Sequence, residues 1–274
     1  MPARLVVPSD ARVFLGRLTR LDPNAVVRLR PAGAGRTELW ARLPWGVLAT
    51  RDLATTVPED LTVGAAALLA ALPGPAAAGG SATAGPATVE PATVEPVATG
   101  PAAAGPATVE PVTAGAARAG PVAARMVTAT GLPPRRDREW RWPLPPDPGE
   151  VLEEIPARRL AEVAAAAART LREVTTTGLA GRPVGVRMLR EALLDHVPIV
   201  VESPAGPAGP AGRVEVPQRL VQGVVRMGFL GRVTDPGAVV RVRRSQRWVG
   251  LAARYGTGWL PPPPGPLTVR PRSA

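Results

Sequence analysis

The sequence contains no cysteine and no lysine, and these two absences exclude several kinds of chemistry. Without cysteine the chain forms no disulfide and offers no thiolate to a metal ion or to a substrate. All 33 basic residues are arginine. Gly74 to Ser81 has the glycine spacing of a phosphate-binding loop, but the lysine that such a loop requires is missing, so the match fails.

Histidine is almost absent as well. His196 is the single histidine, which excludes a metal site built on two imidazoles. It follows Asp195 at the end of an expected helix, where a histidine usually caps carbonyls or faces water. No nucleophile elbow, carboxylate-rich metal loop or dinucleotide motif accompanies it. The sequence therefore predicts no catalytic residue, no metal and no cofactor, and it ranks an enzyme below a binding protein.

Long hydrophobic runs are also missing. No apolar stretch approaches the ~18–20 residues that cross a bilayer, and the N-terminus lacks the apolar core of a signal peptide. We therefore expect a soluble cytoplasmic protein without a membrane partner. Aromatic residues make up only 3% of the 274 residues, whereas 35 prolines and 29 glycines together exceed a fifth. That proportion predicts long segments that do not pack.

The net charge of +11 suggests an acidic partner, but composition offers a second explanation. Arginine, alanine, glycine and proline have GC-rich codons, whereas the scarce asparagine, tyrosine, isoleucine and phenylalanine have AT-rich ones. A GC-rich genome therefore accounts for much of the total. The distribution is uneven, however: residues 203–274 carry eleven arginines and two acids, whereas residues 1–72 carry nine and six. Codon usage does not explain the lack of acids at one end.

The most informative feature present is a repeat. Phe14 to Arg30 reads FLGRLTRLDPNAVVRLR, and Phe229 to Arg243 reads FLGRVTDPGAVVRVR. When Arg20 and Leu21 are omitted, fifteen positions align, of which twelve are identical. The repeat predicts an internal duplication, with residues 14–50 and 229–260 superposing as one unit.

Hydrophobic periodicity gives each repeat the same expected elements. A helix beginning near Ser9 precedes alternating strands, and a helix from Pro217 through Phe229 precedes an equivalent set. Val249, Leu251 and Ala253 match Leu39, Ala41 and Leu43 at a constant offset of 210. The expected strands lie at 25–30, 37–43, 47–51, 125–131, 199–202, 238–243 and 248–253, and further helices are expected at 63–72, 156–174 and 184–195.

These elements predict an α+β fold with two pseudo-equivalent lobes, each a helix on a small antiparallel sheet. The small sheets are expected to pack or join about a pseudo-two-fold axis. Six segments follow: an N-terminal lobe (1–72), a low-complexity disordered linker (73–122), a central strand and helices (123–202), a short Pro/Gly linker (203–213), a C-terminal lobe (214–260) and a Pro-rich tail (261–274).

Between the lobes, tryptophan and arginine alternate among prolines. Trp140 and Trp142 stand beside Arg138 and Arg141, an arrangement that stacks single-stranded bases in some proteins. Asp137 and Glu139 interrupt the positive charge, and tryptophan is usually buried. The favoured interpretation is that both rings cover an edge of the core.

The order of these motifs resembles a known family. FLGR, DP-x-AVVRLR, LWARLPWGVLATR, GLPPRR with a following tryptophan, the Ala-rich helix and GFLGR occur in this order. In this respect the chain is similar to an actinobacterial family of uncharacterised conserved proteins. The resemblance covers both lobes and the central helix and excludes the two linkers. It implies continuity of fold and location, and no activity.

Two function classes remain. The first is a non-catalytic binding or adaptor protein that holds a protein partner between the lobes or on a sheet face. The second is a protein that binds nucleic acid weakly and without sequence preference, since guanidinium groups fit phosphate and release counterions. Its expected contacts are Arg241 and Arg243 on one strand face, Arg244 and Arg247 in the next turn, and Arg28 and Arg30 of the first lobe. The sequence does not determine the oligomeric state.

Overall fold

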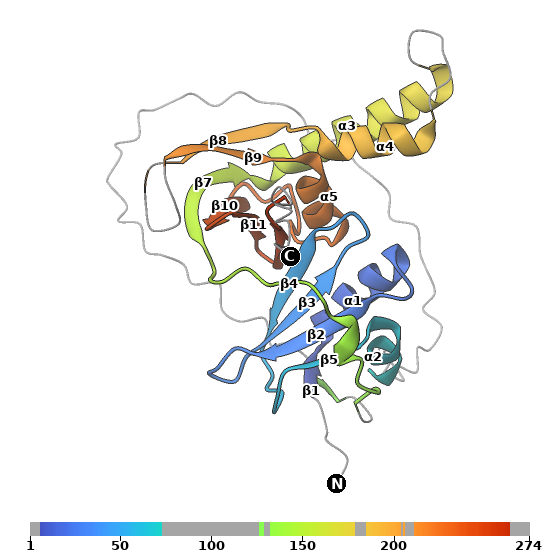
Figure 1. The fold of residues 1–274 in the computed structure, drawn as a ribbon, viewed down its shortest axis with the longest axis vertical. Helices are drawn as coiled ribbons and strands as arrows, with labels where there is room; N and C mark the ends of the chain where they lie inside the picture. The colour runs from blue at the N-terminus through green and yellow to red at the C-terminus, as the bar shows by residue number, and fades with distance from the viewer. Residues whose placement is uncertain are drawn as a thin grey trace, which may run out of the picture. The chain divides into compact units, whose positions relative to one another are not determined.

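The structure is a computed structural model, and it describes residues 6–72, 126–128, 132–178, 185–203, 205 and 211–263 (Figure 1). The predicted disordered linker at 73–122 lies outside the described residues, as does most of the predicted tail.

Each copy of the repeat forms a helix followed by three strands, so the expected order is confirmed. In the first copy these are α1 (Ser9–Leu21), β2 (Val26–Pro31), β3 (Thr37–Arg42) and β4 (Leu48–Leu53). In the second copy they are α5 (Gln218–Arg226), β10 (Val239–Ser245), β11 (Trp248–Ala253) and β12 (Gly256–Leu260).

The other elements lie around and between the copies. They are β1 (Val6–Pro8), β5 (Leu61–Gly64), α2 (Ala65–Ala71), β6 (Met126–Thr128), the short 3₁₀ helix η1 (Asp137–Glu139), β7 (Glu150–Pro156), α3 (Ala157–Thr177), α4 (Val186–Asp195), β8 (Ile199–Ser203) and β9 (Gly212–Val216). The central helices are confirmed. β9 begins within the predicted short linker.

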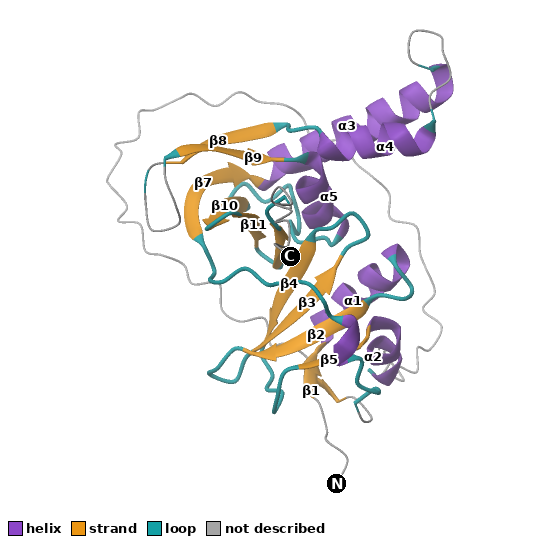
Figure 2. Ribbon diagram, in the orientation of Figure 1, coloured by secondary structure: helices purple, strands orange, loops and turns teal. Residues whose placement is uncertain are grey.

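A small sheet was expected in each lobe, with the two sheets packing or joining; they join, and the resulting sheet is larger than predicted. The three strands of each copy, together with β5 and β7, form one eight-stranded sheet in the order β5-β2-β3-β4-β12-β11-β10-β7. Figure 2 labels every strand of this sheet except β12. β4 and β12 join the two halves as antiparallel neighbours, with Thr50 opposite Thr257. Pairing these strands satisfies backbone groups that would otherwise form two exposed sheet edges. β1–β6 and β8–β9 form separate two-stranded sheets.

Corresponding elements extend beyond the repeated sequence. β5 lies beside β2 and leads into α2, just as β7 lies beside β10 and leads into α3. The Ala65 N–H donates to the Ala25 carbonyl, and the Ala157 N–H donates to the Ala238 carbonyl, both at 2.8 Å. β1 precedes α1 and pairs with β6, as β9 precedes α5 and pairs with β8. The order of the two blocks differs: the β5-α2-β6 block follows the first copy, whereas the β7-α3-β8 block precedes the second.

The two FLGR segments have different backbone structures, which corrects the prediction that 14–50 and 229–260 superpose throughout. Phe14 lies within α1, whereas Phe229 lies in the turn after α5. Gly228, at φ +66°, adopts the left-handed conformation that favours glycine. Its N–H donates to Val225 O and that of Phe229 donates to Val224 O, a pair of bonds that closes a helix C-terminus. The first copy has Val13 before Phe14, and its helix continues.

Other local predictions also need correction. Leu61–Gly64 is a strand beside β2, so the helix expected from residue 63 begins at Ala65. Glu150–Pro156 is a strand that periodicity did not indicate. The register pairs Leu39 with Leu29 and Leu251 with Val242, so Leu39 corresponds to Leu251 and the offset is 212 rather than 210. The loop between β2 and β3 is longer than the two-residue turn between β10 and β11, and the offset falls by one across it, from the 213 that separates Arg28 from Arg241.

The helices cover one face of the sheet and close the main hydrophobic core. Strand residues such as Val27, Leu29 and Val242 are fully buried against them. α1 also contacts the ends of two other helices: Arg12 Nη1 donates to Leu72 O at 2.7 Å, and Arg17 Nη1 donates to Met227 O at 2.5 Å. An arginine at the negative end of a helix dipole stabilises it. The helix layer therefore links the two halves above the β4–β12 junction.

Candidate ligand-binding site on the sheet face

The other face of the sheet is crossed by a segment that we call the strap, residues 132–149. It begins beside β5, where Arg135 forms a β-bridge with Val63. It ends beside β10, where Arg243 Nη1 donates to Pro148 O at 2.8 Å. β5 and β7 are the two edges of the sheet, so the strap spans its width (Figure 1).

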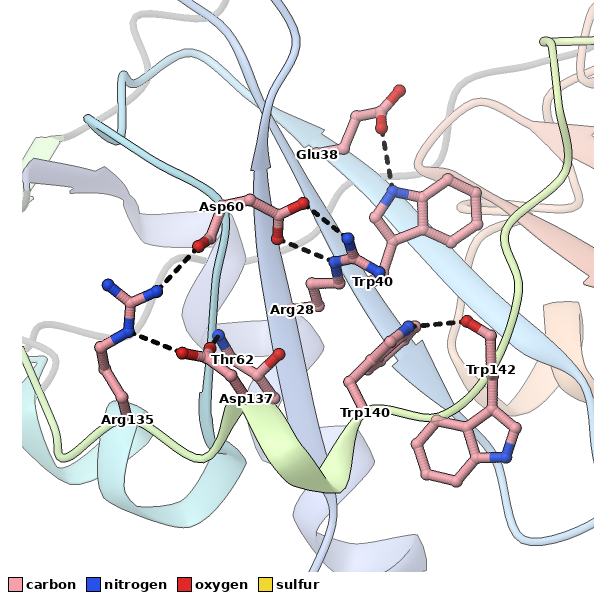
Figure 3. A network of polar contacts seen from close by, with 9 residues as sticks. All are labelled: Arg28, Glu38, Trp40, Asp60, Thr62, Arg135, Asp137, Trp140 and Trp142. Atoms are coloured by element: carbon pink, nitrogen blue, oxygen red, sulfur yellow. Dashed lines mark hydrogen bonds and ion pairs between the residues drawn. The ribbon is translucent and has the colours of Figure 1, made fainter.

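A polar network fastens the strap to β5 (Figure 3). The Thr62 N–H donates to Asp137 Oδ1 at 2.7 Å, and Arg135 Nε donates to Asp137 Oδ2 at 2.7 Å. The hydrogen bond from Thr62, followed by that from Arg135, lowers the pKa of Asp137 because both favour the charged carboxylate. The same carboxylate raises the pKa of Arg135. One side chain therefore holds both the strap and the edge strand.

Arg28 connects this network to the strap's aromatic part. Its Nε and Nη2 donate to the two carboxylate oxygens of Asp60 at 2.8 and 2.7 Å, and its guanidinium lies 5.8 Å from the centre of the Trp140 ring. The hydrogen bond to Asp60 raises the pKa of Arg28. Such a bidentate, stacked arginine positions its neighbours.

Tryptophan rings pack the strap onto the sheet. Trp40, Leu48, Trp248 and Trp259 form a second buried cluster, and Trp140, Trp142 and Leu144 of the strap pack against it. Trp140 and Trp142 meet edge to face with ring centres 5.3 Å apart, and Trp140 Nε1 donates to Trp142 O. The two rings were predicted to cover an edge of the core, and both pack against this second buried cluster.

Beyond the tryptophans, the strap leaves a cavity of about 380 Å³ above the β4–β12 junction. Its floor is formed by Trp40, Thr50, Thr257 and Trp259, and prolines 145, 146 and 148 lie at its strap side. Arg30 of β2 and Arg243 of β10 line it from the two halves of the sheet. These arginines occupy the same position in the two copies of the repeat, so corresponding cations meet at one cavity.

Several polar atoms at this cavity have no hydrogen-bond partner among the described residues. Thr50 Oγ1 and Arg243 Nε are both buried and unpaired. The exposed Arg30 side chain has no ion pair within the described chain. By contrast, the three carboxylates at the cavity are engaged: Asp52 accepts from Arg36 at 2.6 Å, Glu38 accepts from Trp40 Nε1 at 2.9 Å, and Asp147 accepts from the Gly149 N–H at 2.7 Å. Because buried polar groups normally have partners, this arrangement can accept an oxygen-rich ligand.

The six predicted arginines are therefore not equivalent. Arg28 and Arg241 are paired with acids, Arg241 Nε donating to Glu154 at 2.8 Å. Arg244 was expected in a turn, but it lies within β10 on the helix side and is buried, because strand residues alternate between faces. Arg247 is exposed in the turn after β10. Arg30 and Arg243 are brought together.

Sequence reasoning missed the floor of the cavity. Thr50 and Trp259 carry no motif, and they become neighbours only through the β4–β12 pairing. The duplicated arginines were a usable signal, because equivalent residues of two related halves meet wherever a symmetric junction forms.

Among the described residues, no cluster of three or more acidic or histidine side chains is placed to hold a metal ion. Within the same residues, no helix is long and apolar enough to cross a membrane.

Comparisons with known proteins address the fold and family. Two crystal structures from Pseudomonas aeruginosa are similar to this chain. The first is the DNA polymerase III subunit beta, with a TM-score of 0.43 and 15% sequence identity, and the match covers 98% of this chain and 68% of that chain. The second is a DnaN sliding clamp bound to griselimycin, with a TM-score of 0.41 and 14% sequence identity, and the match covers 100% of this chain and 69% of that chain. These scores are too low to carry an argument. A search of curated proteins finds no match.

Two family models match the sequence itself. Residues 4–94 match a domain of unknown function, DUF8010, and residues 144–264 match a domain of unknown function, DUF8185. The two matches cover separate parts of the chain, and both family models describe domains of unknown function.

Proposed function

We propose that this is a non-catalytic, cytoplasmic binding or adaptor protein that holds an acidic segment of a protein partner in the cavity beneath the strap. The observation that carries the proposal is the convergence of Arg30 and Arg243 on a cavity with unpaired buried polar atoms. A carboxylate accepts bidentate hydrogen bonds from guanidinium groups. The tryptophan floor offers apolar and aromatic contact area for the residues beside that carboxylate.

The rigid surroundings support binding rather than chemistry. The strap is anchored at both ends, and its tryptophans are packed on the sheet. A preformed site loses little conformational entropy when it binds. Apart from the two arginines, the charged side chains that line the cavity are the carboxylates of Glu38, Asp52 and Asp147, and each already accepts a hydrogen bond. A segment with a carboxylate is therefore favoured over a reacting substrate.

We also infer that the two halves arose by internal duplication. The twelve identities, the repeated helix-strand-strand-strand order and the repeated backbone bond at the start of α2 and α3 support this inference. The exchanged order of the two blocks implies a rearrangement after the duplication. The inference matters for function because it explains why equivalent arginines face one cavity.

The alternative is weak, sequence-independent nucleic-acid binding through the Arg-rich face. Arg30, Arg243 and Arg247 remain available for phosphate on this proposal. Carboxylate partners at Arg28 and Arg241 reduce the local positive field. Binding to a protein is therefore the favoured proposal, and the two are separated by nuclease treatment and by salt.

The test is co-purification from the native host with partner identification, with and without nuclease. The wild type is compared with the Arg30→Gln, Arg243→Gln double variant. A matched control, Arg20→Gln with Arg232→Gln, removes the same charge from exposed positions outside the cavity. We expect one nuclease-resistant partner that the wild type and the control retain and the cavity variant loses. Retention by the cavity variant, or loss of the partner on nuclease treatment, contradicts the proposal.

A further inference from the structure

A second cavity, of about 350 Å³, lies among three helices at the end of the helix layer. α3, α4 and α5 contact one another there, and the loop carrying Trp45 closes one side. Most of the lining is apolar. The apolar residues are Trp45, Ala167, Ala168, Leu171, Leu193 and Leu194. These side chains are only half-buried. The three helices therefore leave apolar area uncovered around a hollow of a size typical for small molecules.

The polar lining of this cavity consists of two glutamines, Gln218 and Gln222, and two arginines, and Gln222 Nε2 donates to Ala164 O at 3.3 Å. Gln218 is 2% exposed, and its Nε2 is buried without a hydrogen-bond partner among the described residues. Arg190 and Arg226 also line the cavity, and the Arg226 guanidinium lies 5.7 Å from the centre of the Trp45 ring. No aspartate or glutamate lines it. An unpaired buried donor beside two cations indicates that an acceptor with negative charge is missing.

The acids nearest in sequence do not supply that acceptor. α4 carries two carboxylates: Glu191 accepts from Arg187 at 3.0 Å, and Asp195 pairs with Arg219 of α5. Neither faces Arg190 as an ion-pair partner among the described contacts. The positive charge at the cavity is therefore left for a ligand.

We propose that this cavity binds a small apolar carboxylic acid, such as a medium-chain fatty acid. The alkyl part contacts the leucine and alanine side chains of α3 and α4. The carboxylate accepts hydrogen bonds from the Gln218 amide and from Arg190 or Arg226. Water takes about 30 Å³ per molecule in the liquid, so the cavity holds roughly ten groups of that size. The site is separate from the cavity beneath the strap, since none of its lining residues is shared.

Isothermal titration of the full chain with decanoate tests this proposal, with 1-decanol as the uncharged comparison. We expect decanoate to bind and decanol to bind at least about tenfold more weakly, because a charge-assisted hydrogen bond is absent. Arg190→Gln should weaken decanoate binding by about the same factor. Gln218→Leu replaces the unpaired donor by an apolar group of similar size, so the protein should still fold. Its binding of decanoate should be weaker than that of the wild type.

Arg187→Gln is the matched control on the same helix, because Arg187 does not line the cavity. It should bind decanoate as the wild type does. Equal affinity for decanol and decanoate, no binding of decanoate at about 1 mM, or equal loss in Arg187→Gln and Arg190→Gln would overturn the proposal. The Arg30→Gln, Arg243→Gln variant should bind decanoate normally whether or not the proposed partner binding is correct.

Discussion

Thr50 of β4 faces Thr257 of β12 across the strand pairing that joins the two halves of the sheet. The two residues are equivalent: Ala41 pairs with Ala49 just before Thr50, and Ala253 pairs with Gly256 just before Thr257. A pair of equivalent residues opposite each other marks the centre of an antiparallel, two-fold arrangement. This centre forms the floor of the strap cavity and sets Arg30 and Arg243 on its two sides.

Phe14 and Phe229 connect the halves on the helix side of the same junction. Their rings stack with centres 6.1 Å apart, and each residue is 1% exposed. Replacing either with alanine should lower the free energy of unfolding by about 3–5 kcal/mol. The double variant should lose less than the sum, with a coupling of roughly 0.5–3 kcal/mol, because the rings contact each other. Urea denaturation measures all three values.

Val13→Ala is the control for this cycle, since Val13 lies on α1 beside Phe14 and is 51% exposed. It should change stability by no more than about 0.5 kcal/mol. Strict additivity of the two phenylalanine variants would show that the rings do not couple the halves.

Two glycines should respond to alanine in opposite directions. A Cβ at Gly250 would lie 2.7 Å from ring atoms of the buried Trp259, so Gly250→Ala should destabilise the fold by about 1–3 kcal/mol. Gly16 lies within α1 with nothing within 4 Å of a Cβ, so Gly16→Ala should stabilise the fold by about 0.5–1 kcal/mol. Thermal or urea unfolding measures both. A stabilising Gly250→Ala would mean that Trp259 is not packed on β11.

Asp137 should make the strap sensitive to acid. Its pKa is lowered in the folded protein, first by the Thr62 N–H and then by Arg135. The stability that it contributes is therefore present above its unfolded pKa of about 4 and is lost as pH falls through the lower folded value. Asp137→Asn should be less stable than the wild type near pH 6, with a smaller difference near pH 3.

Urea midpoints at both pH values measure this difference between variant and wild type. Glu173→Gln is the control, because Glu173 is exposed on α3 and its carboxylate has no ion-pair partner among the described residues. A difference between Asp137→Asn and the wild type that stays constant over the range would refute the linkage.

Titration with duplex and single-stranded DNA separates the two proposed functions. Since Arg28 and Arg241 are paired with acids and Arg244 is buried, we expect at most weak binding at about 50 mM salt and none at about 200 mM. Replacing Arg30, Arg243 and Arg247 by glutamine should abolish whatever binding is seen. Tight binding that persists at the higher salt and depends on these arginines would instead favour the nucleic-acid proposal.

Much of the secondary structure was predictable from the spacing of apolar residues along the chain. In the strand Val26–Pro31 the apolar Val27 and Leu29 are buried and alternate with the less buried Arg28 and Arg30, and the central helix Ala157–Thr177 carries a continuous apolar stripe. Short elements were harder. β5 has four buried residues in a row, so no alternation marks it as a strand. The helix predicted through Phe229 ends at Arg226, because Gly228 adopts a left-handed conformation that a helix does not continue through.

The sequence by itself determined the repeat, the class of the fold and a set of candidate arginines. It did not determine where those arginines meet. The β4–β12 pairing uses backbone N–H and C=O groups, which are the same for every residue type and leave no signature in the sequence. Likewise, Arg28 is paired with Asp60, a residue 32 positions away in the sequence. Arg30 and Arg243 line the same cavity only because the two halves of the sheet are joined. Only the tertiary structure separated the arginines that pair with carboxylates from those without an ion pair among the described residues.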